Sequence, residues 1–444
     1  MDKRLIAKIF IVVSILFIAT LCGIYGYRFI HYYRLENPKI AKERLLWTTI
    51  TDLNHVVSSG NGLYKDNKEY YYKGAVEDNY VFYSGILWRI VKVDQNNNVI
   101  LISEDALTSM VLGYEADNFK KSYGYDWLNN TFYNQLSNQE LLVEHSYCAD
   151  AILDSNDVRC TKEETGKITM MSVYEYLKAS GSKSYLNNGK TFWTVSPNEE
   201  YKTWFVNQSG LVSNESVSGE SYYSYGIRPV IAVKGDTKIL AGSGTKDSPY
   251  QITIIKSSAL KEQFIGSYVS YSNQIWRIIE INDLGVKIAL NGYLKVNDEE
   301  ISEPFSKDSN LYSIKSTDNI GYYLNSKYYD SLENKEYLVE YPWRNYYYNS
   351  VEKYNYHGKA ADVVRTEVGL LQVSDLFIND FSDYALMNPA NEDDGTVFTV
   401  LKDGRLFANS VTENLKVRPA VVLKINLTIS GGSGTESDPF EIGV

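Results

Sequence analysis

The chain has 444 residues, a length that exceeds one ordinary hydrophobic core and predicts two or three domains. Hydrophobic residues make up 44% and charged residues 22%, so we expect most of the chain to fold. The net charge of −11 argues against nucleic acid as a partner, because nucleic-acid binding is driven by basic surfaces. Tyrosine occurs 39 times, which indicates either an AT-rich genome or a tyrosine-rich binding surface.

An apolar run without charges, Ile9 to Tyr27, lies near the amino terminus. Its 19 residues would form a helix of roughly 28 Å, close to the hydrocarbon thickness of a bilayer. Lys3, Arg4 and Lys8 precede the run, as in a signal sequence, and no small residues are placed for cleavage after it. We therefore predict a signal anchor in which residues 1–8 are cytoplasmic and residues 9–27 cross the lipid bilayer.

Two cysteines bear on the orientation of this anchor, which basic residues on both sides of the run leave undecided. Cys148 and Cys160 are separated by eleven residues, a spacing that suits a local disulfide in an oxidising compartment. Two unrelated buried thiols are the alternative. We expect a single-pass protein of the cell membrane, with its amino terminus in the cytoplasm and its bulk outside the cell.

Residues 28–61 are predicted to form a juxtamembrane helical stalk. Leu46, Ile50, Leu53 and Val57 follow one another at intervals of four, three and four, which places them on one helical face. The serine- and glycine-rich run that follows predicts the end of this helix.

Internal comparison indicates that the remaining chain consists of one module used twice. The segment VFYSGILWRIVKV, residues 81–93, corresponds to VSYSNQIWRIIEI, residues 269–281. GIRPVIAVK likewise corresponds to KVRPAVVLK. Six such blocks recur in the same order at an offset of about 190 residues. We therefore predict two extracellular modules, residues 62–255 and residues 256–444.

Each module is predicted to place helices between strands. The block that contains WRI alternates between polar and apolar residues and is β-rich. Leu128, Phe132 and Leu136 lie four residues apart, as on an amphipathic helix. The segment VYEYL, residues 173–177, and its counterpart VSDLF, residues 373–377, predict a second, short helix. Because strands stand at both ends with helices between them, the predicted fold class is α+β.

The order of these blocks resembles a bacterial domain family of unassigned function, the DUF6273-like family found in surface proteins of low-GC Firmicutes. The blocks that carry the resemblance are WRI, LN–FYN–L, the short helix, W–SP and G–RP–I, and they cover roughly residues 62–444. The resemblance implies an extracellular or surface module and supplies no established activity. The G-x-RP strand and the W–SP turn also resemble the C-type-lectin-like fold, an analogy of fold alone. Lys416 replaces Gly226 in the second module, so a ligand site of the family would survive in the first module only.

The sequence offers no set of residues typical of catalysis. A Ser-His-Asp arrangement needs a histidine held by a carboxylate, and neither His145 nor His357 has a matching acid or nucleophile in the paired blocks. Asp94 to Asp105 departs from the spacing of an EF-hand calcium loop, and Asn391 to Asp394 suits an ordinary solvated loop better than a calcium site. We therefore expect no enzyme activity, no cofactor and no metal.

Four residues of the first module recur in the second module. They are Trp88, Arg89, Arg228 and Pro229, with the counterparts Trp276, Arg277, Arg418 and Pro419. We predict structural roles for them, with the tryptophans in the core and the arginines pairing with backbone or carboxylate groups.

A second set of candidates consists of tyrosines in predicted loops. They are Tyr222, Tyr223, Tyr346, Tyr347 and Tyr348. Their aromatic rings predict contacts with a ligand, and packing in the core or in an interface is the alternative.

Three classes of function remain open. The leading hypothesis is a membrane-anchored cell-surface protein that presents two non-catalytic binding or adhesion modules to a glycan or a surface protein. A structural or assembly factor of the cell envelope is the second hypothesis. An extracellular enzyme that acts on polysaccharide or peptide is the third. The ligand and the oligomeric state do not follow from the sequence.

Overall fold

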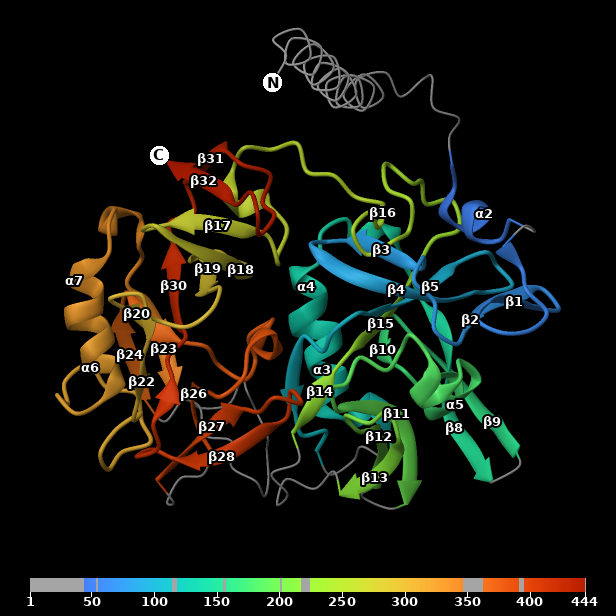
Figure 1. Cartoon of the computed structure of the whole chain (residues 1–444), viewed down its shortest axis with the longest axis horizontal. Helices are drawn as coiled ribbons and strands as arrows, with labels where there is room; N and C mark the ends of the chain where they lie inside the picture. The colour runs from blue at the N-terminus through green and yellow to red at the C-terminus, as the bar shows by residue number, and fades with distance from the viewer. Residues whose placement is uncertain are drawn as a thin grey trace, which may run out of the picture. The chain divides into compact units, whose positions relative to one another are not determined.

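A computed structural model describes residues 44–52, 55–113, 118–154, 157–199, 202–216, 224–345, 362–390 and 395–443 (Figure 1). The described chain has a β-rich α+β fold, and its residues from 46 onward form one compact unit. The predicted membrane span, residues 9–27, lies outside the described residues. In the part of the chain that is described, no helix is both long and apolar enough to cross a membrane.

The described part of the first half, defined as residues 62–255, contains a nine-stranded sheet, a five-stranded sheet and a two-stranded hairpin. The main path of the larger sheet is β1 (Gly62–Asp66), β2 (Glu69–Lys73), β4 (Ile86–Val93), β5 (Val99–Ser103), β15 (Pro229–Val233) and β10 (Ile168–Met170). Three further strands complete it, namely β3 (Tyr80–Tyr83), β7 (Leu142–Val143) and β16 (Tyr250–Gln251). The smaller sheet has the order β13 (Val212–Ser216), β12 (Lys202–Val206), β11 (Phe192–Glu199), β14 (Tyr225–Ile227) and β6 (Thr108–Met110).

The second half, defined as residues 256–444, contains sheets of similar composition. The larger sheet has the order β25 (Val368–Leu370), β30 (Pro419–Leu423), β19 (Gly285–Leu290), β18 (Gln274–Asn282), β17 (Tyr268–Tyr271), β32 (Phe440–Gly443) and β31 (Thr428–Gly431). The smaller sheet has the order β22 (Ser302–Glu303), β29 (Leu415–Lys416), β26 (Tyr384–Pro389), β27 (Thr396–Val400) and β28 (Leu406–Ser410). β20 (Lys295–Val296) and β21 (Glu299–Glu300) form a separate two-stranded sheet.

The two halves match in strand register as well as in strand order. Trp88 pairs with Val81, and Trp276 pairs with Val269. Each indole nitrogen donates to a carbonyl five residues earlier at 3.0 Å, and both tryptophans are fully buried. Both central strands also carry an irregularity two residues after the arginine, between Ile90 and Lys92 and between Ile278 and Glu280. A shared irregularity keeps the later side chains of both strands in equivalent positions.

The predicted amphipathic helix is present in both halves. In the first half α3 (Tyr123–Asp126), a π-helical stretch η3 (Trp127–Phe132) and α4 (Tyr133–Gln135) follow one another without a break. Ser122 accepts from the Tyr125 amide and so caps the first turn. Leu128, Phe132 and Leu136 are buried, as their spacing predicts. The second half has the same order in α6 (Ile320–Tyr323), η7 (Leu324–Tyr328) and α7 (Tyr329–Ser331).

The second predicted helix forms in the first half only. There α5 (Val173–Lys178) begins with a capping box, in which Ser172 and Glu175 each accept from the backbone amide of the other. The prediction of a helix at the counterpart, residues 373–377, is wrong, because turns occupy these residues after strand β25. Phe377 has a φ of 63°, a left-handed conformation that an α-helix does not accommodate.

Residues 28–43 of the predicted stalk lie outside the described residues, and in the described part the helix ends earlier than its apolar pattern indicates. α2 spans only Leu46–Ile50, and both of these residues are buried in the core. Val56 forms a parallel bridge with Leu63 instead of continuing the helix. The Leu46 amide donates to the Thr237 carbonyl, so this end of the predicted stalk belongs to the compact unit. The helical spacing could not reveal that the apolar face would meet the module instead of a partner helix.

The two predicted disulfide cysteines lie on an antiparallel hairpin, β8 (His145–Asp154) and β9 (Asp157–Gly166). Cys148 and Cys160 are bonded, with their Cα atoms 5.7 Å apart. The disulfide closes a loop of twelve residue steps, which stabilises the fold by about 3 kcal/mol in the chain-entropy description. The hairpin packs beside α5, as Figure 1 shows. The corresponding hairpin of the second half, β23 (Tyr341–Asn345) and β24 (Asp362–Thr366), carries no cysteine.

The two halves contact each other through buried polar groups. Asn379 Nδ2 donates to Ser109 Oγ at 2.9 Å and to the Gly404 carbonyl at 2.8 Å. The Phe377 amide donates to the Leu107 carbonyl at 2.7 Å. Buried polar groups that find partners across such a contact fix its geometry, because leaving any of them unpaired is costly.

A second close contact between the halves lies at Gly85, in the turn between β3 and β4, where the backbone approaches the backbone of Ile265. Gly85 has a φ of 76°, and a Cβ atom there would lie 1.6 Å from the Ile265 carbonyl oxygen. Only glycine combines this conformation with so close an approach.

We predict that the Asn379→Ala variant loses about 2 kcal/mol of unfolding free energy, because Ser109 Oγ and the Gly404 carbonyl lose a buried donor. Chemical denaturation of the full chain measures this loss. The exposed Asn134→Ala variant is the control and is expected to stay close to the wild type. Equal stability of Asn379→Ala and the control would contradict the assigned contact.

Candidate functional site

The five tyrosines predicted to bind a ligand lie in two segments outside the described residues. Tyr222 and Tyr223 lie outside the described residues, and so do Tyr346, Tyr347 and Tyr348. Their role stays a prediction.

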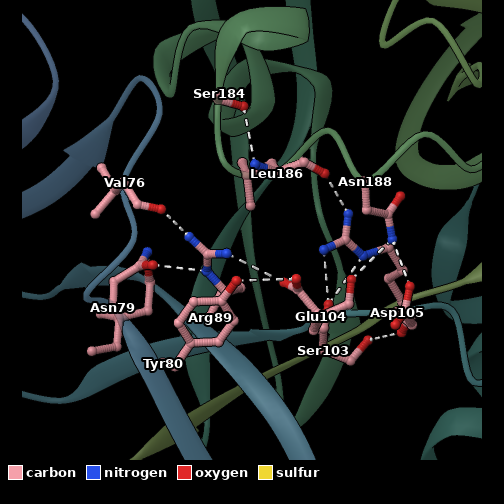
Figure 2. A network of polar contacts seen from close by, with 12 residues as sticks. Val76, Asn79, Tyr80, Arg89, Ser103, Glu104, Asp105, Ser184, Leu186 and Asn188 are labelled. Carbon is pink, nitrogen blue, oxygen red and sulfur yellow. Dashed lines mark hydrogen bonds and ion pairs between the residues drawn. The ribbon is translucent and has the colours of Figure 1, made fainter. Parts of the chain in front are cut away.

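Arg89 lies in a buried polar network of the first half. Its Nε donates to Asn79 Oδ1 at 2.7 Å, and its Nη2 donates to the Val76 carbonyl. Figure 2 shows the guanidinium between these partners, with the carboxylate of Glu104 on its other side at 3.5 Å. The Tyr80 ring stacks under the guanidinium, with its centre 3.9 Å away. These contacts leave Arg89 only 3% exposed, which fits structural pairing better than ligand contact.

The arginines that directly precede β15 and β30 contact main-chain carbonyls. Arg228 donates to the carbonyls of Ser103 and Leu186, and Arg418 donates to those of Leu290 and Phe377. Both arginines are almost completely buried. The prolines that follow them, Pro229 and Pro419, begin β15 and β30. Burial lowers the pKa of Arg228 from its ordinary value, although the nearby carboxylates of Glu104 and Asp105 favour the charged form.

Arg277 occupies the place of Arg89 in the second half and has different partners. Its Nη1 bonds to Asp380 at 2.6 Å, and its Nε donates to the Gly266 carbonyl at 3.2 Å. The guanidinium lies over the Phe377 ring at 3.7 Å from its centre. The two arginines therefore occupy the same position in the fold but have different hydrogen-bond and ion-pair partners.

A cleft of about 320 Å³ opens between the larger sheet of the first half, the root of the β8–β9 hairpin and α5. This volume lies at the lower end of the range for small-molecule sites. Glu69 and Tyr71 of β2, Lys92 of β4, and Tyr174 and Glu175 of α5 line it. The cleft is the candidate functional site of the described chain, because polar groups and aromatic rings converge on it.

An ion pair between Lys92 and Glu175 lies in this cleft. Lys92 Nζ is 3.4 Å from Glu175 Oε1, and the two side chains are 21% and 12% exposed. Burial lowers the pKa of Lys92, but the carboxylates of Glu175, Glu69 and Glu163 together outweigh burial and raise it above its ordinary value. Lys92 is therefore a charged donor beside an excess of acceptors.

His145 contributes a buried imidazole to the same cleft. Its Nε2 lies 3.0 Å from Thr169 Oγ1, whereas its Nδ1 has no hydrogen-bond partner among the described residues. Burial lowers the pKa of His145 to about 4, so the ring is neutral near pH 7. An unpaired polar atom in a buried ring is costly, which makes it a natural contact for a ligand or a water molecule.

The equivalent place in the second half is filled by its own side chains. The register places Glu280 where Lys92 stands and Lys287 where Ile100 stands. Lys287 Nζ bonds to both oxygens of Asp375, at 2.7 and 2.8 Å, and the side chains are only 2% and 6% exposed. The rings of Trp343 and Tyr341 cover the ammonium group, with centres 5.1 and 5.9 Å away. Tyr341 stands in the register position of His145.

Comparisons with protein-family models, curated proteins and solved structures give no significant match. In the described ranges no group of three or more His, Cys, Asp and Glu side chains is arranged to hold a metal ion.

Sequence reasoning missed this cleft, although one signal was present. Aligning the WRI blocks residue by residue places Lys92 opposite Glu280, a reversal of charge between two apolar neighbours in each strand. Such a reversal indicates that the surroundings of the two positions differ. The pairing of these residues with α5 and its counterpart could not be read from the blocks.

We predict that the unfolding free energy falls by up to about 3 kcal/mol as the pH decreases from 6.5 to 4. In this range the histidine of the unfolded chain binds a proton, whereas buried His145 in the folded chain stays neutral. Above pH 6.5 both states are neutral and the contribution is constant. Denaturation of the His145→Gln variant across this range should show a shallower loss.

The exposed His55→Gln variant serves as the control and should follow the wild type. If His145→Gln lost stability as steeply as the control, the neutral buried imidazole would be excluded.

Proposed function

We propose that the protein is a membrane-anchored cell-surface protein whose two tandem modules are binding or adhesion modules without catalytic activity. In this proposal the anchor is residues 9–27, the modules are residues 62–255 and 256–444, and the ligand is a glycan or a surface protein. The resemblance to the DUF6273-like family, and the analogy to the C-type-lectin-like fold, belong to the same proposal.

The observation that carries the proposal is the difference between the halves at one equivalent place. The first half has an open cleft with Lys92, Glu175 and His145, whereas the second half buries Lys287 and Asp375 under aromatic rings. A buried ion pair that is fully enclosed serves structure, and an ion pair in an open cleft can exchange a partner for a ligand. We infer that the first module binds and that the second module supports it.

The side chains of the cleft favour binding over catalysis. Glu175 already accepts from the Ser172 amide at the start of α5, so part of its acceptor capacity is used in the fold. His145 is held neutral and bonds to Thr169 instead of to a carboxylate that would orient a general base. The disulfide between Cys148 and Cys160 is consistent with an oxidising compartment outside the cell.

A structural role in the envelope is the second candidate, and the buried contact between the halves favours it. Asn379, Ser109 and Gly404 hold both modules in one compact unit, as a rigid spacer would need. Duplication would then serve rigidity instead of multivalent binding.

Filling the cleft tests the proposal. Ser146 is exposed and lines the cleft, so the Ser146→Trp variant should block it without disturbing the core. We predict that the full chain in nanodiscs sediments with cell-wall polysaccharide or with immobilised surface protein, and that Ser146→Trp lowers this binding about ten-fold or more.

The matched control is Ser302→Trp, at an exposed strand residue of the second half. Equal binding of both variants would move the conclusion to the structural role. Turnover of the bound material that is abolished by the Glu175→Gln variant would move it to an enzyme.

A further inference from the structure

The cleft of the first half carries an excess of negative charge. Five carboxylates line it, whereas its lysines are Lys92 and Lys178. The carboxylates belong to Glu69, Asp94, Glu144, Glu163 and Glu175. With His145 neutral, the net charge of the lining is about −3.

The carboxylates differ in the number of hydrogen bonds and ion pairs that they make within the protein. Asp94 accepts from the backbone amides of Asn96 and Asn98 and so closes the turn between β4 and β5. Glu175 is bonded to Lys92 and to the first turn of α5. The carboxylate groups of Glu69 and Glu144, in contrast, make no hydrogen bond and no ion pair within 4 Å among the described residues, although Glu69 lies near enough to Lys92 to raise its pKa. Unused acceptors in a concave site favour a ligand that donates hydrogen bonds and carries positive charge.

The aromatic rings of the cleft already hold an ammonium group. Lys178 Nζ lies 4.4 Å from the centre of the Tyr71 ring and 5.9 Å from that of Tyr174. The nearest carboxylate that pairs with this lysine is Asp66 at 3.6 Å. Ring faces attract ammonium groups through their quadrupoles, so the tyrosines are compatible with a cationic ligand.

His145 supplies a second observation, independent of the carboxylates. It is only 3% exposed, it lines the cleft, and its Nδ1 has no partner within the described chain. In the tautomer whose Nε2–H donates to Thr169 Oγ1, Nδ1 is an acceptor with a free lone pair. A donor group that reached this atom would remove the cost of leaving it unpaired.

In the second half, the position that corresponds to the cleft holds the ammonium group of a lysine. There Lys287 brings an ammonium group to Asp375, beneath the rings of Tyr341 and Trp343 and 4.0 Å from Glu280. Burial opposes the charge of Lys287, but Asp375 and Glu280 outweigh burial and raise its pKa. The fold therefore binds an ammonium group between a carboxylate and aromatic rings at the corresponding position.

From these contacts we propose that the first-half cleft binds a small hydrophilic ligand with a primary ammonium group, held by Glu69 and Glu144 against the tyrosine rings. This inference rests on the proposed binding function and names its ligand class. The ammonium could belong to an amino sugar or to a lysine side chain, since about 320 Å³ accommodates one of either.

The test is calorimetric titration of the full chain in detergent micelles at low ionic strength. The probes are D-glucosamine, its neutral counterpart N-acetyl-D-glucosamine, and Nα-acetyl-lysine methylamide. We expect at least one of the two amines to bind about ten-fold or more tightly than the acetylated sugar. The tighter of the two amines identifies the source of the ammonium.

The double variant Glu69→Gln/Glu144→Gln should lose this binding by about ten-fold or more. The control Glu299→Gln/Glu340→Gln removes the same charge from exposed sites of the second half, where Glu340 stands in the register position of Glu144. Unchanged melting temperatures of both double variants establish that they are folded.

Equal binding of glucosamine and its acetylated form would overturn the ammonium inference and leave the cleft as a neutral-ligand site. Unchanged glucosamine binding in the cleft variant, or no heat from either amine, would also overturn it. The proposed function is judged separately by the Ser146→Trp experiment, so the two failures are distinguishable.

Discussion

The backbone of Phe377 joins the two halves, and much of the described fold is organised about it. Its amide donates to the Leu107 carbonyl of the first half, and its own carbonyl accepts from buried Arg418. Its ring lies beneath Arg277. These three contacts are made from a left-handed backbone conformation, which an α-helix does not accommodate. α5 accordingly has no helical counterpart in the second half.

The contact between the halves changes how the duplication is understood. Two modules on a flexible tether would raise avidity, because the second site binds at high effective concentration. Modules held together by buried hydrogen bonds cannot adjust their spacing to a ligand in this way. The second module has also filled the place of the cleft with Lys287 and Trp343. One binding module and one supporting module fit these observations better than two equal binding modules.

The sequence predicted the parts of the fold that depend on local pattern and on repetition. The burial of Trp88 and Trp276, the helix of Leu128, Phe132 and Leu136, and the bond between the two cysteines all follow from spacing or from recurrence. The end of the stalk helix did not follow from its pattern. Helical periodicity shows that a face is apolar and does not show which surface covers it.

The cleft was beyond sequence reasoning for a different physical reason. It is formed by β2, β4, a hairpin and α5, which are separated by as many as a hundred residues and meet only in the folded chain. His145 was noted for lacking an acid or a nucleophile in the sequence, and its significance lies instead in a buried nitrogen without a partner. The alternation of polar and apolar residues and the order of the repeated blocks do not show whether a buried polar atom has a hydrogen-bond partner.

We propose that the compact unit of residues 46–444 meets its ligand outside the membrane. Protease added to intact cells tests this proposal, with immunoblotting for both ends of the chain and for a cytoplasmic marker. We expect the compact unit to be lost while the marker stays intact. Protection of the unit in intact cells, followed by its digestion once the cells are opened, would contradict it.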